Sequence, residues 1–68
     1  MIKGGSTINL VTTEGTGVLV QVDKIREIRP AFTRTGRQVA EIEFYDGMII
    51  TVREHPGKIL GMIYGQGK

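Results

Sequence analysis

The chain has 68 residues, a formal net charge of +2 and a pI near 9.3. A domain this small buries only about 60% of its unfolded surface, and without cysteine it has neither a disulfide framework nor a thiolate metal site. The weak positive charge argues against a dedicated nucleic-acid binder, and no apolar run approaches the ~18 residues that span a bilayer. We interpret residues 1–68 as a single domain, with a loose lead-in at 1–6 and a frayed end at 66–68.

Two strands open the predicted fold, TINLVT at 7–12 and VLVQV at 18–22. In both, apolar residues alternate with polar or outward-facing ones, which is typical of a strand with one buried face. Turn-forming residues separate the two runs and predict a hairpin. Pairing Leu10 with Val20 places the apolar faces of both strands on the same side.

At Asp23 the alternation gives way to an apolar spacing of three residues. This predicts a single helical turn or a kink, capped by Asp23. A third strand follows over 26–32, and Pro30 within it has no N–H to donate. The third strand is therefore expected to be an edge strand at Pro30, or to end there.

The stretch from 38 to 54 predicts a hairpin closed at Tyr45-Asp46-Gly47. A two-residue Asp-Gly turn is one option, but it would place polar residues on the apolar face. A three-residue loop pairs Ile42 with Ile50 and keeps the apolar faces together, and a one-residue slip would expose them. We therefore predict the three-residue loop, with Gly47 in the left-handed region as a bulge.

The segment HPGKILGMIY predicts a short C-terminal helix with Pro56 in its first turn. Ile59 with Ile63, and Leu60 with Tyr64, are spaced four residues apart and predict one apolar face. A helix this short is stable only when it docks on the sheet.

Together these elements predict a mostly β protein with five short antiparallel strands and one short C-terminal helix. The strands form either a bent sheet or an SH3-like barrel. A small sheet leaves edges that must be closed, charged or paired with another chain. Apolar residues are also expected on outer faces, at Leu19, Val39, Tyr45 and Ile49, where a homo-oligomer or a larger partner would cover them.

Signals for enzymatic activity are nearly absent, and we predict no catalytic, cofactor-binding or metal-ligating residue. The only histidine, His55, precedes Pro56 and is expected to begin the helix rather than act as a base. Glu41 and Glu43 share a strand face and could imitate a two-carboxylate site. Because the predicted pairing sets Arg29 opposite Glu41, we interpret these charges as a solvated strand face.

A basic cluster surrounds the third strand and the loop after it. An aromatic side chain beside arginines at a hairpin tip can contact phosphates and stack on bases. Two or three such contacts give weak, salt-sensitive binding. The candidate residues for contact with nucleic acid or a partner are Lys24, Arg26, Phe32, Arg34 and Arg37.

Three stretches resemble the small flagellar protein family FlbD: Ile8–Thr12 (I-x-L-x-T), Val20–Ile28 (V-x-V-D-x-I-x-x-I) and Ile42–Glu54 (I-x-F-x-D-G-x-x-I-x-V-R-E). The V-D-x-I-x-x-I part is also similar to part of the LytTR-type DNA-binding β-module. The FlbD resemblance implies a cytoplasmic bacterial or phage accessory protein without catalytic residues.

The sequence therefore predicts a non-enzymatic β-module that acts through protein–protein contacts or self-assembly, with an accessory or regulatory role in the cytoplasm. The alternative is a nucleic-acid-binding module that uses the arginine-rich region of the third strand and its loop. The expected partner is a protein or further copies of the chain, or nucleic acid under the alternative. No cofactor is expected.

Overall fold

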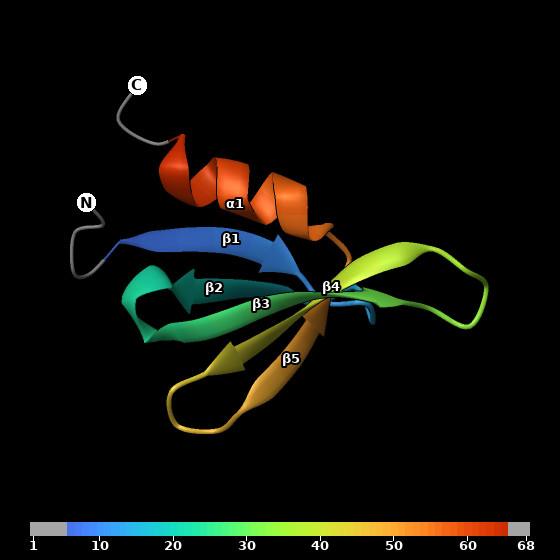
Figure 1. The fold of residues 1–68 in the computed structure, drawn as a ribbon, viewed down its shortest axis with the longest axis horizontal. Helices are drawn as coiled ribbons and strands as arrows, with labels where there is room; N and C mark the ends of the chain where they lie inside the picture. Colours follow the sequence, from blue (N-terminus) through green and yellow to red (C-terminus); the bar gives the residue numbers. More distant parts are fainter. Residues whose placement is uncertain (1–5, 66–68) are drawn as a thin grey trace.

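The computed structural model describes residues 6–65, so residues 1–5 of the predicted lead-in and the predicted frayed end at 66–68 lie outside them. The fold is mostly β, as predicted, and all strand pairs are antiparallel (Figure 1). The elements are β1 (Thr7–Val11), β2 (Gly17–Gln21), the 3-10 turn η1 (Val22–Lys24), β3 (Ile25–Phe32), β4 (Gln38–Phe44), β5 (Ile49–Val52) and α1 (Pro56–Tyr64).

The strands form two sheets, β1-β2 and β3-β4-β5. A short bridge between Thr12 and Val52 joins β1 to β5, and next to it the Arg53 N–H donates to the Val11 carbonyl over 2.8 Å. Beyond η1, β2 and β3 do not pair, so the strand order β2-β1-β5-β4-β3 remains open between its two ends. Of the two predicted forms, a bent sheet or an SH3-like barrel, the structure has no closed barrel and is an open pair of bridged sheets.

All three hairpins have the same loop, which is three residues long and ends in glycine. Gly15, Gly36 and Gly47 have φ angles of +93°, +89° and +93°, in the left-handed region that glycine adopts without steric cost. The N–H of each glycine donates to the carbonyl of the residue three positions earlier, which is Thr12, Thr33 or Phe44 respectively. The predicted three-residue loop Tyr45-Asp46-Gly47 and the predicted left-handed conformation of Gly47 are confirmed.

The register of the first hairpin differs from the prediction. Leu10 lies opposite Val18, and Val20 lies opposite Ile8, so the predicted pairing of Leu10 with Val20 is wrong by two residues. The cause is the loop, which is two residues shorter than the predicted one. A slip of two residues leaves every side chain on its own face, so Ile8, Leu10 and Val20 are still buried.

The three-stranded sheet has the predicted register, with Ile42 opposite both Ile28 and Ile50. β3 is an edge strand, as Pro30 predicted. The 3-10 turn before it is also confirmed, but Asp23 does not cap it. The N-cap position is Gln21, which makes no side-chain capping bond.

The core lies between the two sheets and under α1. Its buried side chains are Ile8, Leu10, Val20, Val22, Ala40, Ile42, Val52 and Ile59. Leu19, Tyr45 and Ile49 are exposed, as predicted, whereas Val39 is only 2% exposed and the prediction for it is wrong. Val39 is opposite Ala31 and at the end of β4 where β1 joins β5.

Helix α1 begins as predicted, with Pro56 in its first turn and His55 as the N-cap. The His55 Nδ1 accepts a hydrogen bond from the Lys58 N–H over 3.2 Å. Ile59 is fully buried, but Leu60 and Tyr64 are 43% and 66% exposed. The prediction of one shared apolar face is wrong for these two residues, because successive residues are rotated by about 100° around a helix. Within residues 6–65, no helix is long and apolar enough to cross a membrane.

We expect Gly61→Ala to raise the free energy of unfolding by about 1 kcal/mol, because alanine favours a helix interior over glycine by that amount. A Cβ built at Gly61 meets no atom within 4 Å. The matched control is Gly47→Ala, which should lose about 1–2 kcal/mol because Gly47 has a positive φ. Urea unfolding of both variants measures the two changes. A loss of stability in Gly61→Ala would contradict the open space at that position.

Candidate functional site

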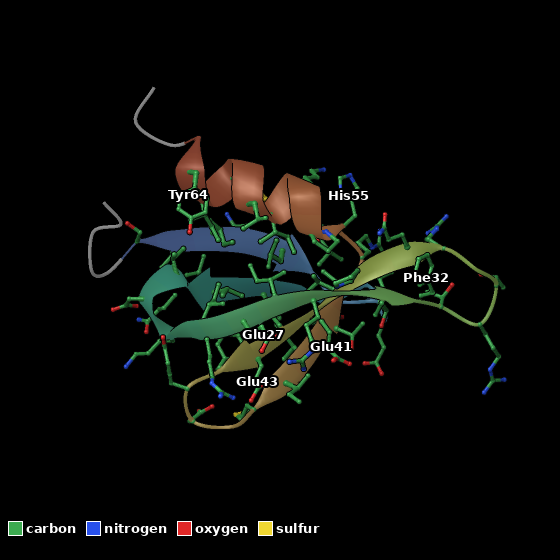
Figure 2. All side chains as sticks on the ribbon, viewed as in Figure 1. Glu27, Phe32, Glu41, Glu43, His55 and Tyr64 are labelled. Carbon is green, nitrogen blue, oxygen red and sulfur yellow. The ribbon has the colours of Figure 1, made fainter. Side chains whose placement is uncertain are left out.

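An ion-pair cluster occupies the outer face of the three-stranded sheet. The Arg29 guanidinium lies 2.9 Å from both Glu41 Oε1 and Glu43 Oε1, and 3.3 Å from Glu27 Oε1. Figure 2 shows the three carboxylates gathered on this face. This confirms the interpretation that Arg29 and the carboxylates form a charged strand face.

Arg26 also belongs to this cluster, which the sequence did not indicate. A register shift between Ile25 and Glu27 marks a bulge at Arg26, and bulges re-aim side chains. The Arg26 Nη1 consequently lies 2.8 Å from Glu43 Oε2. Arg26 is thus engaged in an ion pair, unlike the unpaired cation expected for phosphate contact.

The charges of this cluster shift one another's pKa values. Hydrogen bonds to Glu43 and Glu41 raise the pKa of the Arg29 guanidinium above its ordinary value. Hydrogen bonds from Arg29, and then from Arg26, lower the pKa of the Glu43 carboxyl below its ordinary value of 4.5. Both charged forms therefore persist throughout the neutral range.

Acidification should weaken the fold partly through Glu43. Because its pKa is lower in the folded state, the unfolded chain binds this proton first as pH falls, so its stabilisation is complete above about pH 4.5 and is lost below. In Glu43→Gln we expect a shallower decline in the free energy of unfolding between pH 6 and pH 3. Arg29→Gln should flatten the same part of the curve. Curves parallel to that of the original chain would contradict this role.

The loop between β3 and β4, with Phe32 before it, projects from one end of the molecule (Figures 1 and 2). We call residues 32–37 the arginine arm. Phe32 is 68% exposed, and Arg34 and Arg37 are also exposed. Within residues 6–65, neither arginine forms an ion pair. The arm thus combines an exposed aromatic ring with two available guanidinium groups.

The structure separates the predicted contact residues into two groups. Lys24 ends η1 and Arg26 lies at the start of β3, whereas Phe32 lies at the end of that strand. A strand rises about 3.3 Å per residue, so Arg26 and Phe32 are about 20 Å apart. Phe32, Arg34 and Arg37 therefore form one candidate surface, and Lys24 belongs to a different one.

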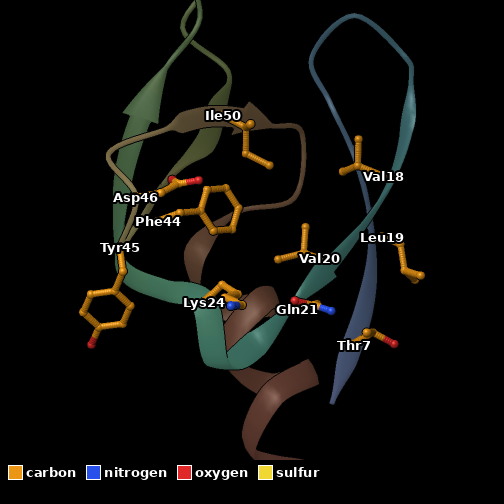
Figure 3. A pocket seen from close by; sticks show the side chains of 10 residues that line it. All are labelled: Thr7, Val18, Leu19, Val20, Gln21, Lys24, Phe44, Tyr45, Asp46 and Ile50. Carbon is orange, nitrogen blue, oxygen red and sulfur yellow. The ribbon is translucent and has the colours of Figure 1, made fainter. Parts of the chain in front are cut away.

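Lys24 lies at a groove between β2 and the β4–β5 hairpin (Figure 3), which we call the β2 groove. Its volume is about 820 Å³. Val18, Phe44 and Ile50 are half-buried within it, because the two sheets diverge here. The groove is lined by Thr7, Val18, Leu19, Val20, Gln21, Lys24, Phe44, Tyr45, Asp46 and Ile50.

The outer edge of β2 runs along this groove without a partner strand within residues 6–65. The Thr12 N–H bonds to the Thr16 carbonyl, and the Val22 N–H bonds to the Ser6 carbonyl. Hydrogen-bonded pairs alternate along an antiparallel ladder, so the even-numbered residues of β2 point their backbone groups toward β1. The N–H and C=O groups of Gly17, Leu19 and Gln21 consequently point away from it.

Glu54 joins the two sheets, and sequence patterns did not single it out. Both of its carboxylate oxygens lie 3.2 Å from the Val11 N–H, while the Val11 carbonyl accepts from the Arg53 N–H. The two partners are 43 positions apart in the chain. Nothing in the sequence distinguishes Glu54 from an exposed carboxylate such as Glu14, because the contact exists only after folding.

No protein-family model matches this chain, and neither a curated protein nor a solved structure matches it. Within residues 6–65, no group of three or more histidine, aspartate or glutamate side chains is placed to hold a metal ion. The structure thus offers two candidate contact surfaces, which are the β2 groove with its strand edge and the arginine arm.

Proposed function

We propose that the chain is a non-enzymatic β-module that acts through protein–protein contacts or self-assembly, in an accessory or regulatory role. The observation that carries the proposal is the outer edge of β2, unpaired within residues 6–65 and beside an apolar groove. Such an edge is a template for pairing with another chain, and charged residues, proline and bulges are among the features that protect edges from it. None of these three features occurs in Gly17–Gln21.

The resemblance to FlbD proteins in Ile8–Thr12 and Ile42–Glu54 supports the accessory role, because that family implies a bacterial or phage accessory protein. The proposed location is the cytoplasm, which suits a chain without cysteine. The exposed Leu19, Tyr45 and Ile49 would be covered in the complex.

The test is the native mass by light scattering at low and high salt, on a sample whose 260/280 nm absorbance ratio reports bound nucleic acid. An assembly that is indifferent to salt and free of nucleic acid supports the proposal. A clean monomer that also retains no protein in a pull-down contradicts it. A monomer that carries nucleic acid at low salt and releases it at high salt favours the second candidate function.

That second candidate is binding of single-stranded nucleic acid by the arginine arm. The specific observation in its favour is that Phe32 is exposed beside Arg34 and Arg37, neither of which is ion-paired within residues 6–65. Bases stack on exposed aromatic rings while arginines contact the backbone. The mild net charge of +2 makes this binding weak and dependent on salt.

If the arm binds nucleic acid, Arg34→Ala with Arg37→Ala should reduce the slope of log affinity against log salt by about 1.4, because each lost phosphate contact on a single strand contributes about 0.7. The matched control is Lys24→Ala with Arg26→Ala, which removes the same charge at the other end of β3 and should retain the original slope. Fluorescence anisotropy with a labelled single strand measures both. An equal loss in the two double variants would assign the binding to net charge instead.

A further inference from the structure

We infer that the chain forms dimers by exchanging its first hairpin, so that β1 of each copy packs against β5 of the other. The inference rests on the self-assembly named in the proposed function. It uses the junction between the two sheets and does not depend on the outer edge of β2. The partner is a second copy because this chain supplies both sides of that junction.

The hydrogen bonds of the junction can all be exchanged. The Arg53 N–H donates to the Val11 carbonyl over 2.8 Å, and the Glu54 carboxylate accepts from the Val11 N–H. The Thr13 N–H donates to the Thr51 carbonyl over 3.2 Å. Each bond joins the first hairpin to β5 or to the segment just after it. A second copy therefore forms every one of them unchanged.

The buried core divides along the same boundary. Helix α1 follows β5 in the chain, so it stays with the three-stranded sheet when the hairpin is exchanged. The hairpin contributes Ile8, Leu10 and Val20 to the core, and the receiving half contributes Ala40, Ile42, Val52 and Ile59. Neither half buries these side chains by itself. A second copy supplies the missing half with the matching side chains, whereas an unrelated strand does not.

The connection between the two halves is short and lies between extended residues. The 3-10 turn η1 spans only Val22–Lys24 and forms the bend between β2 and β3 (Figure 1). On either side, Gln21 has φ −81° and ψ 118°, and Ile25 has φ −77° and ψ 125°. One backbone bond closes the turn, from the Ile25 N–H to the Val22 carbonyl. Breaking this bond and extending η1 joins β2 and β3 into one strand, which carries the first hairpin away from its own β5.

The backbone bonds at the two ends of η1 are compatible with this opening. The Val22 N–H bonds to the Ser6 carbonyl beside β1, and the Lys24 carbonyl accepts from the Tyr45 N–H beside β4. Each bond lies within one half of the molecule and therefore survives the exchange. Asp23, between them, is exposed. Exchange through such a hinge repeats the native contacts at low cost, and short hinges favour it.

Cysteine cross-linking distinguishes this dimer from other dimers, because the chain itself has no cysteine. Thr12 and Val52 face each other across the junction, and the bonds on either side of them mark a non-hydrogen-bonded pair. The Cα atoms of such a pair lie about 4.5 Å apart, within reach of a disulfide. The full chain carrying Thr12→Cys is mixed with the full chain carrying Val52→Cys, and the two are unfolded together in urea, refolded and oxidised.

We expect this mixture to form a covalent dimer on non-reducing electrophoresis, in a yield that rises with the protein concentration during refolding. An exchanged dimer of the two variants brings both cysteines together at one of its junctions. In a monomer, or in a dimer that uses another surface, each chain keeps its own junction and the two cysteines do not meet. Either variant refolded alone should give no covalent dimer.

The matched control is a mixture of Asn9→Cys and Leu19→Cys, which face each other within the first hairpin. The hairpin stays whole during the exchange, so this mixture should give no more covalent dimer than each variant alone. Circular dichroism checks that each variant refolds. If Val52→Cys does not, Thr13→Cys with Thr51→Cys tests the same junction at less buried positions.

A change in hinge length tests the mechanism independently. Two glycines inserted after Asp23 lengthen η1 and should shift the population from dimer to monomer in light scattering, because a longer hinge lets the hairpin close on its own chain more easily. The same insertion after Gly36, in the loop between β3 and β4, should leave the population unchanged.

An assembly in which the Thr12→Cys and Val52→Cys chains do not cross-link overturns the exchange while leaving self-assembly through another surface intact. Cross-linking of Leu19→Cys chains with one another would also overturn it and would place the interface at the edge of β2. A chain that stays monomeric after refolding at millimolar concentration overturns the inference altogether. The proposed function is then decided separately, by whether a pull-down retains a protein partner.

Discussion

Ile42→Ala should reduce the free energy of unfolding by about 2–5 kcal/mol, the usual cost of truncating a fully buried isoleucine. Ile42 is 0% exposed and lies on β4, between β3 and β5. A single small core seldom supplies more than about 3–5 kcal/mol. The substitution therefore removes most of the stability, and a substantial fraction of the chain should be unfolded at 25 °C. Chemical unfolding followed by circular dichroism measures the effect.

Ile49→Ala is the matched control, with the same chemical change on the neighbouring strand. Ile49 is 51% exposed, so its truncation leaves no internal cavity and should cost under about 0.5 kcal/mol in the monomer. Equal losses in the two variants would contradict the placement of the core. Because Ile49 is one of the exposed apolar residues, the control is measured at low protein concentration, where the proposed self-assembly would not contribute to stability.

Glu54→Ala should destabilise the fold by about 1–3 kcal/mol, because it leaves the partly buried Val11 N–H without an acceptor. The loss weakens the junction of the two sheets, where the Val11 carbonyl also bonds to Arg53. The same unfolding experiment measures this change, and hydrogen exchange at the Val11 amide reports the junction directly.

Glu54→Gln keeps one side-chain carbonyl oxygen in the position of the carboxylate and should lose distinctly less stability than Glu54→Ala. Asp23→Ala removes an exposed carboxylate that makes no side-chain cap to η1 and should change stability by less than about 0.5 kcal/mol. If Glu54→Ala behaves like Asp23→Ala, the bond to Val11 does not contribute to folding.

The sequence predicted the second and third hairpins better than the first, for a reason that lies in the two-residue period of strands. At Gly47, the competing loops differed by one residue, so only one of them placed Ile50 and Val52 on the same face as Ile42. At Gly15, the competing registers differed by two residues. Both registers bury Leu10 and Val20, so hydrophobic pattern cannot choose between them, and the turn geometry decides.

The candidate site was harder to predict because residues that are close in the sequence can lie far apart on the surface when an extended strand separates them. Arg26 and Arg34 are close in sequence, yet a fully extended β3 carries them to opposite ends of the sheet. Arg26 then contacts Glu43 because of a bulge, and the residue types in this part of β3 do not indicate that bulge. The β2 groove depends on the divergence of two sheets, which arises only from tertiary packing.

The three hairpin loops, which share their length and their hydrogen bond, also affect the expected order of folding. Each hairpin closes over three residues, so its contacts are local and its closure costs little chain entropy. The bond between Val11 and Glu54 instead joins residues 43 positions apart. Most of the chain entropy that loop closure costs is therefore lost when the two sheets come together. The hairpins are therefore expected to form early, and the junction of β1 with β5 to form late, near the end of the folding pathway. Loss of that junction would first separate the molecule into two pre-formed sheets, with the inner faces of both exposed to water.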